Sequence, residues 1–217
     1  MHARRSLIAL CAALLCSAAA AQVPGLGAKI VGLAGGGVFS AWNPADADSG
    51  FTFSNSNLTW TNTSSQQVVR STTSRTTGKY YFEATVVSAG GTNRVGVATA
   101  TESLTAAFGA DANGAAYYDM GAVSYNNSVY CNGSTYTAGD IIGVAVDLTN
   151  DLLYFSKNGA WQCSFNPSAG TGGMPIMNAA LFAASATYLG GGSRSMTANF
   201  GKTAFSYTIP TGFSAWH

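Results

Sequence analysis

The fold is decided by residues 139–165, which read GDIIGVAVDLTNDLLYFSKNGAWQCSF. Residues 141–147 are almost continuously apolar after the turn pair Gly139-Asp140, which is typical of a strand covered on both faces. Residues 152–156 and 161–165 flank Asn158-Gly159, and an Asn-Gly pair between apolar runs is the strongest short signal for a β-hairpin. The stretch therefore predicts a buried strand followed by a hairpin in which Ser156 lies opposite Trp161.

Strand patterns continue on both sides of this stretch. Between residues 79 and 87 the side chains alternate with the period of a half-buried strand, which places Glu83 on the outward face, pointing to water or to a partner. Residues 196–200 and 205–209 predict two closing strands, with Gly201 between them. Because the chain also has 26 Gly and only 5 Pro, together with abundant Thr, Ser, Tyr and Val, we expect an all-β domain.

The composition excludes several classes of protein. Charged residues make up 9% of the 217 residues and hydrophobic residues 47%, whereas charged residues are roughly 25% of an ordinary soluble domain. A disordered, highly charged chain is therefore excluded. The formal net charge is +1 and the Lys and Arg residues form no cluster. Since a nucleic-acid-binding protein needs a concentrated basic face, we expect no nucleic-acid partner.

The first 21 residues have the pattern of a secretory signal peptide. Arg4 and Arg5 precede an apolar stretch and a run of small residues that suits cleavage before Gln22. The apolar stretch is too short to span a bilayer, and no later segment is long enough. Cys11 and Cys16 each follow a Leu, which disfavours a lipoprotein signal. We expect a secreted or periplasmic bacterial protein with a signal peptide (1–21), a flexible Gly/Ala-rich leader (22–41) and one domain (42–217).

Cleavage would leave few groups for catalysis or metal binding. Removing Arg4 and Arg5 leaves 8 basic against 9 acidic residues, a net charge of −1, and His217 becomes the only histidine. A terminal histidine is a poor candidate for a nucleophile pair or a zinc site. Cys131 and Cys163 also remain, either as one disulfide or as two small buried residues. We expect no catalytic residues, no metal and no cofactor.

Several segments together resemble the SPRY (B30.2-related) domain, in the compact variety of bacterial and phage proteins. Their order and spacing agree over about residues 42–213, beginning with the opening WNP at 42–44. The matching segments are GKYYFE (78–83), VGVA (95–98), GDIIGVAVD (139–147), LYFSKNG (153–159) and NFG (199–201). The resemblance implies a bent antiparallel β-sandwich related to the concanavalin A-like jelly rolls.

The resemblance also implies binding of a protein or peptide partner through loops at one end of the sandwich. In the peptide-binding members an Arg lies shortly before the Gly-Lys-aromatic strand, and Arg70 matches it. Further contacts come from the loop at residues 99–108, which contains Thr101, and from an aromatic beyond it, where Tyr117 and Tyr118 stand. Binding residues gather on loops carried by a rigid sandwich, and Tyr, Trp and Arg are the types that anchor interfaces. The aromatic Trp161 and the polar Asp119, next to Tyr118, therefore complete the set of candidate ligand-binding residues. Each of them has an alternative role in packing or in surface ion pairs.

Other functions remain as alternatives. A lectin-like carbohydrate-binding module would use the Asn- and Ser-rich loops at 54–57 and 126–128, with Tyr125 and Tyr130 nearby, although these loops also suit ordinary turns. A jelly-roll glycoside hydrolase is less favoured, because no closely spaced pair of carboxylates projects from one strand face. Residues 111–114 (DANG) resemble the start of a calcium loop but lack the later acidic ligand, which favours a turn. The sequence leaves the oligomeric state open.

Overall fold

The computed structural model describes residues 39–188 and 190–217, which form β-strands and one short 3-10 helix. The expected signal peptide (1–21) and all but the last three residues of the expected leader (22–41) lie outside this part of the chain. Within it, no helix is long and apolar enough to cross a bilayer.

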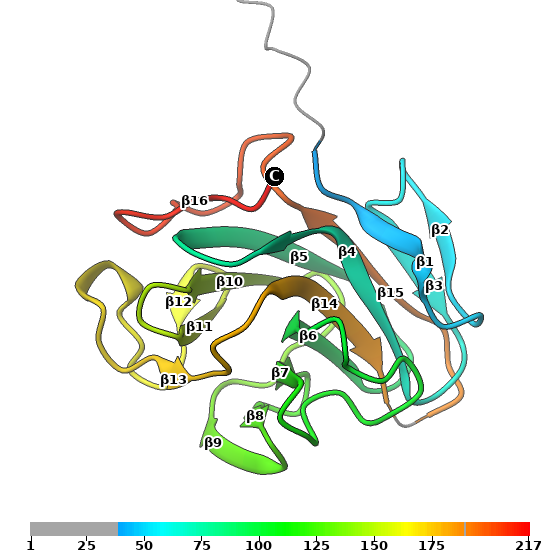
Figure 1. Cartoon of the computed structure of the whole chain (residues 1–217). Coiled ribbons are helices and arrows are strands. Elements are labelled where there is room, and N and C mark those ends of the chain that lie inside the picture. Colours follow the sequence, from blue (N-terminus) through cyan, green and yellow to red (C-terminus); the bar gives the residue numbers. More distant parts are fainter. Residues whose placement is uncertain (1–38, 189) are drawn as a thin grey trace, which may run out of the picture. The chain divides into compact units, whose positions relative to one another are not determined.

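The strands form two sheets, and Figure 1 shows β7–β9 at the bottom of the view and β16 near the top. Sheet A is antiparallel and has the order β1 (Trp42–Ala47), β4 (Gln67–Arg75), β14 (Leu181–Thr187), β6 (Asn93–Ala98), β7 (Gly114–Tyr118), β8 (Ala122–Tyr125) and β9 (Ser128–Asn132). Sheet B has the order β12 (Ala160–Trp161), β11 (Leu152–Lys157), β10 (Ile141–Asp147), β5 (Lys79–Ala89), β15 (Arg194–Asn199), β3 (Thr59–Asn62) and β2 (Thr52–Ser54). Two short strands join sheet B from its sides: β13 (Met174–Pro175) beside β11 and β16 (Ser214–Ala215), in parallel, beside β5. The 3-10 helix η1 spans Pro167–Ala169.

The predicted all-β sandwich is confirmed, and so is the hairpin at its clearest signal. Ser156 pairs with Trp161 across β11 and β12, as predicted. Asn158 and Gly159 have φ values of 48° and 78°. This left-handed pair is the geometry of a type I′ turn, whose twist matches that of the flanking strands. The second apolar run is shorter than expected, since β12 contains only Ala160 and Trp161.

The core between the sheets is rich in aromatic side chains. Trp42, Trp60 and Trp216 are fully buried, and Phe82 packs against both Phe200 and Trp216 with ring centroids 5.6 Å apart in each pair. Aromatic side chains bury large areas, so this cluster holds the two sheets face to face.

Two predictions about sheet B are wrong. Glu83 is only 1% exposed, and residues 205–209 form no strand. Both differences have one cause. Residues 202–211 cross the outer face of sheet B as an irregular segment, and Glu83 accepts hydrogen bonds from the backbone N–H groups of Ser206 (2.8 Å) and Tyr207 (2.9 Å). The outward face of β5 is therefore covered by the chain itself.

Candidate interaction site

Arg70 lies on the outer face of sheet A. The register places it in one row with Ala184, Gly96 and Ala116, so the centre of this face is a trough of small residues. The Arg70 guanidinium is satisfied within the protein: Nε and Nη2 donate to the Asp46 carboxylate (2.8 and 2.5 Å), and Nη1 donates to the Glu102 carbonyl (2.7 Å). Because Arg70 is only 5% exposed, this geometry makes it an anchor for the loop above it.

The loop at residues 99–113 fills the trough. Phe108 is buried in a small apolar cluster on this face, with Val68 and Ala116 among its members, and Leu104 packs against the cluster. Thr101 is exposed on the outside of the loop, where its hydroxyl donates to Asn113 Oδ1 (2.9 Å). Asp111 accepts a hydrogen bond from the Asn113 backbone N–H (2.8 Å), as in an ordinary turn. The loop therefore holds Thr101 at the surface on a defined backbone.

The same loop contains a buried carboxyl group that sequence reasoning missed. Glu102 is 3% exposed and lies beside Asp111. Burial raises the pKa of Glu102 to about 8, with a further increase from the neighbouring Asp111 carboxylate and a smaller opposing effect of Arg70. Glu102 therefore keeps its proton at neutral pH. Only the fold brings Glu102 under cover, so no local sequence signal marks it.

Tyr118 belongs to a second cluster on the outer face of sheet A. Tyr118 and Tyr188 stack on the two sides of the Arg94 guanidinium, at 3.8 and 3.7 Å from its carbon to the ring centroids. Arg94 Nη1 and the Tyr118 hydroxyl both donate to the Phe108 carbonyl (2.6 and 3.1 Å), so this cluster also fastens the covering loop.

Asp119 and Tyr117 have internal partners as well. Asp119 accepts a hydrogen bond from the Asn93 backbone N–H (2.8 Å), and burial raises its pKa. Tyr117 points the other way, into the core, where it is fully buried against Tyr136 and donates its hydroxyl hydrogen to the Ser134 carbonyl. Of the candidate residues, the fold thus gathers Arg70, Thr101 and Tyr118 on one face, with Asp119 at its rim.

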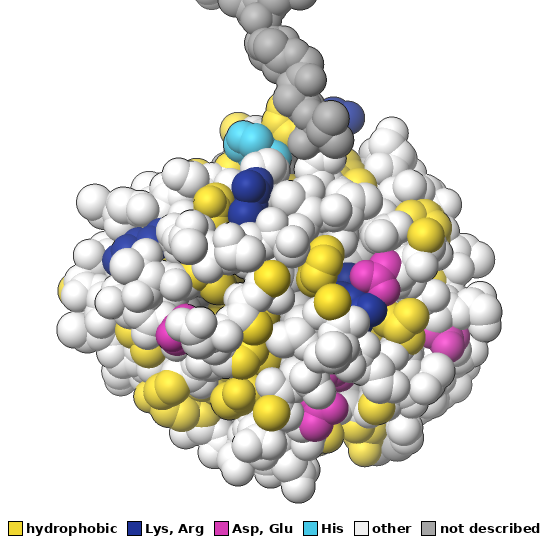
Figure 2. Space-filling model, viewed as in Figure 1, with side chains coloured by type: hydrophobic (Ala, Val, Ile, Leu, Met, Phe, Trp, Pro, Cys, Tyr) yellow, Lys and Arg dark blue, Asp and Glu magenta, His cyan; other side chains and the backbone are white. Residues whose placement is uncertain are grey.

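Exposed apolar side chains concentrate on a different part of sheet A. Met120, in the turn between β7 and β8, is 70% exposed, and Val129 and Tyr130 on β9 are 57% and 49% exposed. A shallow groove of about 410 Å³ adjoins Val129 and Tyr130. Its lining residues are Tyr125, Ser128, Val129, Tyr130, Met174 and Pro175. In Figure 2, apolar side chains gather on this part of the surface, near β9 and β13.

The β9 edge is held rigidly. The structure joins Cys131 on β9 to Cys163, just after β12, by a disulfide that links the two sheets. The Tyr130 hydroxyl also contacts the Gly173 carbonyl (3.3 Å) in the neighbouring loop. Since β9 is the last strand of sheet A, its outer edge pairs with no other strand among the described residues.

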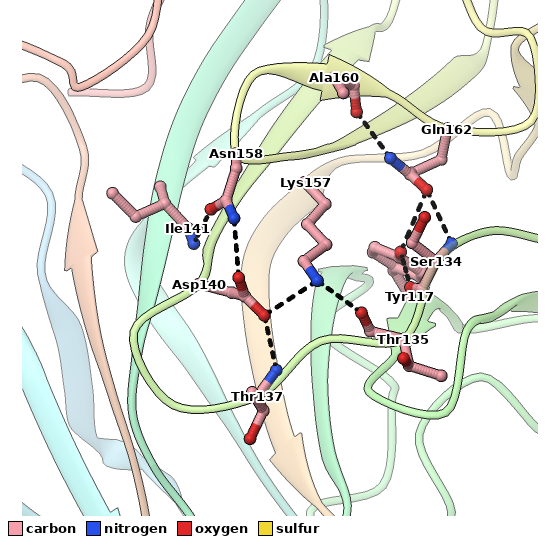
Figure 3. Close-up of polar contacts among 10 residues, drawn as sticks. All are labelled: Tyr117, Ser134, Thr135, Thr137, Asp140, Ile141, Lys157, Asn158, Ala160 and Gln162. Atoms are coloured by element: carbon pink, nitrogen blue, oxygen red, sulfur yellow. Dashed lines mark hydrogen bonds and ion pairs between the residues drawn. The ribbon is translucent and has the colours of Figure 1, made fainter.

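Trp161 lies away from these clusters, on the hairpin of sheet B. A polar network fixes this hairpin, as Figure 3 shows. Lys157 binds the Asp140 carboxylate (3.1 Å) and donates to the Thr135 carbonyl (2.8 Å), while the Asn158 side chain bridges Asp140 and the Ile141 N–H. The hairpin turn is thus tied to the loop before β10, and Trp161 is held half-buried beside a pocket on the outer face.

Across residues 39–188 and 190–217, no three His, Cys, Asp or Glu side chains are placed to share a metal ion.

Comparisons with known proteins agree with the fold. A family model for the SPRY domain matches residues 79–178, which confirms the resemblance seen in the sequence. The crystal structure of the SPRY domain of human HERC1 has a TM-score of 0.60 at 17% identity, covering 76% of this chain and 100% of that one. The stonustoxin structure has a TM-score of 0.56 at 18% identity, covering 74% of this chain and 27% of that one. At these identities the structural likeness establishes the fold.

Proposed function

We propose that this chain, whose residues 79–178 match the SPRY domain, binds a protein partner through the β7–β9 edge of sheet A, without catalysis and without a cofactor. SPRY domains serve as protein-interaction modules, which sets the class of function. The observation that carries the location is that Val129 and Tyr130, two exposed side chains on β9, both line the apolar groove. The other large hydrophobic residues exposed in the described part of the chain are Met120, in the β7–β8 turn, and Val87, on β5.

An extended apolar segment of the partner fits this surface. Strand β9 ends the sheet, so a partner strand can pair with its free backbone groups, as in other cases of strand addition to a sheet edge. The groove lined by Tyr125, Met174 and Pro175 would receive the partner's side chains. Because the disulfide at Cys131 fixes β9 in advance, little conformational entropy would be lost on binding.

The loop at residues 99–113 has a supporting role in this proposal. The loop backbone accepts hydrogen bonds from Arg70 at the Glu102 carbonyl and from Arg94 at the Phe108 carbonyl, and Tyr118 stacks on Arg94. These contacts hold the loop over the outer face of sheet A. Thr101 remains available as a contact at the surface. A partner that reached from β9 towards Thr101 would lie along the sheet edge and the covering loop.

We also propose that the protein is exported to the periplasm or the medium. The support is the pattern of residues 1–21 together with the Cys131–Cys163 disulfide, since disulfides persist in oxidising compartments.

The test uses dodecapeptides displayed on phage and selected on the purified protein. Selected peptides should bind the wild type and lose at least tenfold in affinity to Val129→Asp, which places a charge in the apolar surface. Val87→Asp is the matched control, because Val87 is a similarly exposed valine on β5. If the selected peptides bind Val129→Asp as well as they bind the wild type, the β9 edge is not the binding surface.

A further inference from the structure

A pocket of about 360 Å³ opens on the outer face of sheet B. It lies between the β11–β12 hairpin and the irregular segment at residues 202–211, and it shares no residue with the β7–β9 surface. Its volume is at the lower end of the range for small-molecule sites, about 300–1,000 Å³. The residues that the argument uses are Tyr81, Ser156, Trp161, Ser168, Tyr207 and Thr211.

The floor of the pocket exists because position 143 is a glycine. Glu83, Gly143, Ser156 and Trp161 form one row across four strands, so their positions face the same side of sheet B. A Cβ at Gly143 would come within 2.5 Å of the Tyr81 hydroxyl and would overlap Ser156 Oγ. The missing side chain therefore leaves room for two hydroxyl groups at the centre of the row.

These two hydroxyls retain hydrogen-bonding capacity. Ser156 is 1% exposed, and its Oγ lies beside the Tyr81 hydroxyl without a hydrogen bond of good geometry. Tyr81 donates its hydroxyl hydrogen to Glu83 Oε1 (3.1 Å), so its oxygen remains an acceptor. Burial, together with the charge of Glu83, raises the pKa of Tyr81, which keeps it protonated. Because a buried hydroxyl without a partner is costly, Ser156 is poised to bond a ligand.

The walls of the pocket are aromatic and uncharged. Trp161 and Tyr207 are both half-buried, and the Tyr207 ring lies against Gly159 in the hairpin turn. The rim carries further hydroxyls, among them Ser168, which accepts a hydrogen bond from the Thr211 N–H (3.1 Å). Among the described residues that line the pocket, none is Asp, Glu, Lys, Arg or His. A charged ligand would find no counter-charge there, while a purely apolar one would leave the buried hydroxyls unpaired.

We propose that this pocket binds a neutral saccharide, with one sugar ring packed against Trp161 and its hydroxyls bonded to Ser156, Tyr81 and Tyr207. The apolar face of a pyranose ring suits an aromatic side chain, and sugar hydroxyls both donate and accept, as the hydroxyls of the pocket do. The site is built before binding: Glu83 holds the backbone of Ser206 and Tyr207, and the Asp140–Lys157–Asn158 network holds the hairpin.

The fluorescence of the protein offers a local probe of the site. Of the four tryptophans, Trp42, Trp60 and Trp216 are fully buried, whereas Trp161 is half-buried at the pocket. Iodide should therefore quench mainly Trp161, and a bound sugar should protect it. The probes are cellotriose, maltotriose, mannotriose and N,N′,N″-triacetylchitotriose, with trigalacturonic acid as the charged counterpart. Affinities are measured in parallel by calorimetry on the purified protein.

We expect at least one neutral trisaccharide to reduce quenching by iodide, and trigalacturonic acid to have no effect. Tyr207→Phe and Ser156→Ala each remove one hydroxyl and should weaken binding several-fold, whereas Tyr125→Phe removes a matched hydroxyl at the β9 groove and should change nothing. Absence of protection by all four neutral sugars would overturn the proposal. So would binding that survives both Tyr207→Phe and Ser156→Ala. Selection of peptides at β9 is a separate measurement, so either proposal can fail alone.

Discussion

Glu83 offers a direct test of how the outer face of sheet B is closed. Its carboxylate is buried and accepts three hydrogen bonds, from the backbone N–H groups of Ser206 and Tyr207 and from the Tyr81 hydroxyl. Hydrogen bonds to a charged group contribute about 1.5–3 kcal/mol each. Ser206 is exposed and Tyr207 half-buried, so water can replace part of what is lost in Glu83→Ala. We therefore take the lower end of this range for each of the two backbone hydrogen bonds, which gives a loss of about 3 kcal/mol in the free energy of local opening.

The measurement is amide hydrogen exchange by NMR. A loss of about 3 kcal/mol in local opening free energy corresponds to exchange roughly a hundredfold faster at the amides of Ser206 and Tyr207. Glu83→Gln should give an intermediate effect. The amide oxygen of Gln can still accept a hydrogen bond from one of the two backbone N–H groups, whereas its NH₂ group cannot accept one from the other. Asp151→Asn is the control, since Asp151 is a surface carboxylate that binds the Asn178 side chain (2.8 Å). Unchanged exchange at residues 206 and 207 in Glu83→Ala would refute this account of the covering segment.

Two further predictions concern stability. The Cys131–Cys163 disulfide spans a sequence separation of 32, for which the chain-entropy relation gives a stabilisation of about 3.7 kcal/mol. The double variant Cys131→Ala/Cys163→Ala should therefore melt roughly 7–15 °C lower than the wild type by calorimetry. An equal melting temperature would contradict that relation for this protein. Because the pKa of Glu102 is raised to about 8 in the folded protein from an ordinary value of 4.5, the folded state binds more protons between these values, and stability should fall as pH rises from about 4.5 to about 8. The free energy of unfolding, measured with urea at pH 5, 6.5 and 8, should fall less steeply with pH in Glu102→Gln than in the wild type. An identical fall in the variant would show that other groups cause the pH dependence.

The hairpin could be predicted in register because its determinants are local. Asn158-Gly159 selects a two-residue turn, and that turn alone places Ser156 opposite Trp161. Glu83 could not be placed in the same way. Alternation correctly put it on the outward side of β5, but the segment that covers it lies more than 120 residues later in the chain. Strand periodicity reports which face a side chain takes, and only the tertiary fold decides what covers that face.

The tyrosines show the same limit. Tyr117 and Tyr118 are neighbours on β7 and therefore point to opposite faces, one into the core and the other to the Arg94 cluster. Since both faces of sheet A are covered, the first by sheet B and the second by residues 99–113, apolar and polar patterning does not distinguish them. The exposed residues of β9 were equally hidden in the sequence, because its residues, SVYCN, include none of the Lys or Pro that often mark an edge strand.

The two proposed sites follow from one property of the fold. Each sheet has its outer face closed by an irregular segment, and the Arg and Glu side chains on those faces, chiefly Arg70 and Glu83, are used to hold the segment rather than to meet a ligand. Because the chain has so few charged residues, we expect its functional surfaces where the covering segments leave a sheet face or edge open. On sheet A the closure stops at β9, whose apolar edge suits another polypeptide. On sheet B it leaves a gap above Gly143, and the hydroxyls in that gap suit a small polar molecule. Site residues in such a sandwich are thus the ones that the covering segments leave unbonded, such as Ser156, or uncovered, such as Val129.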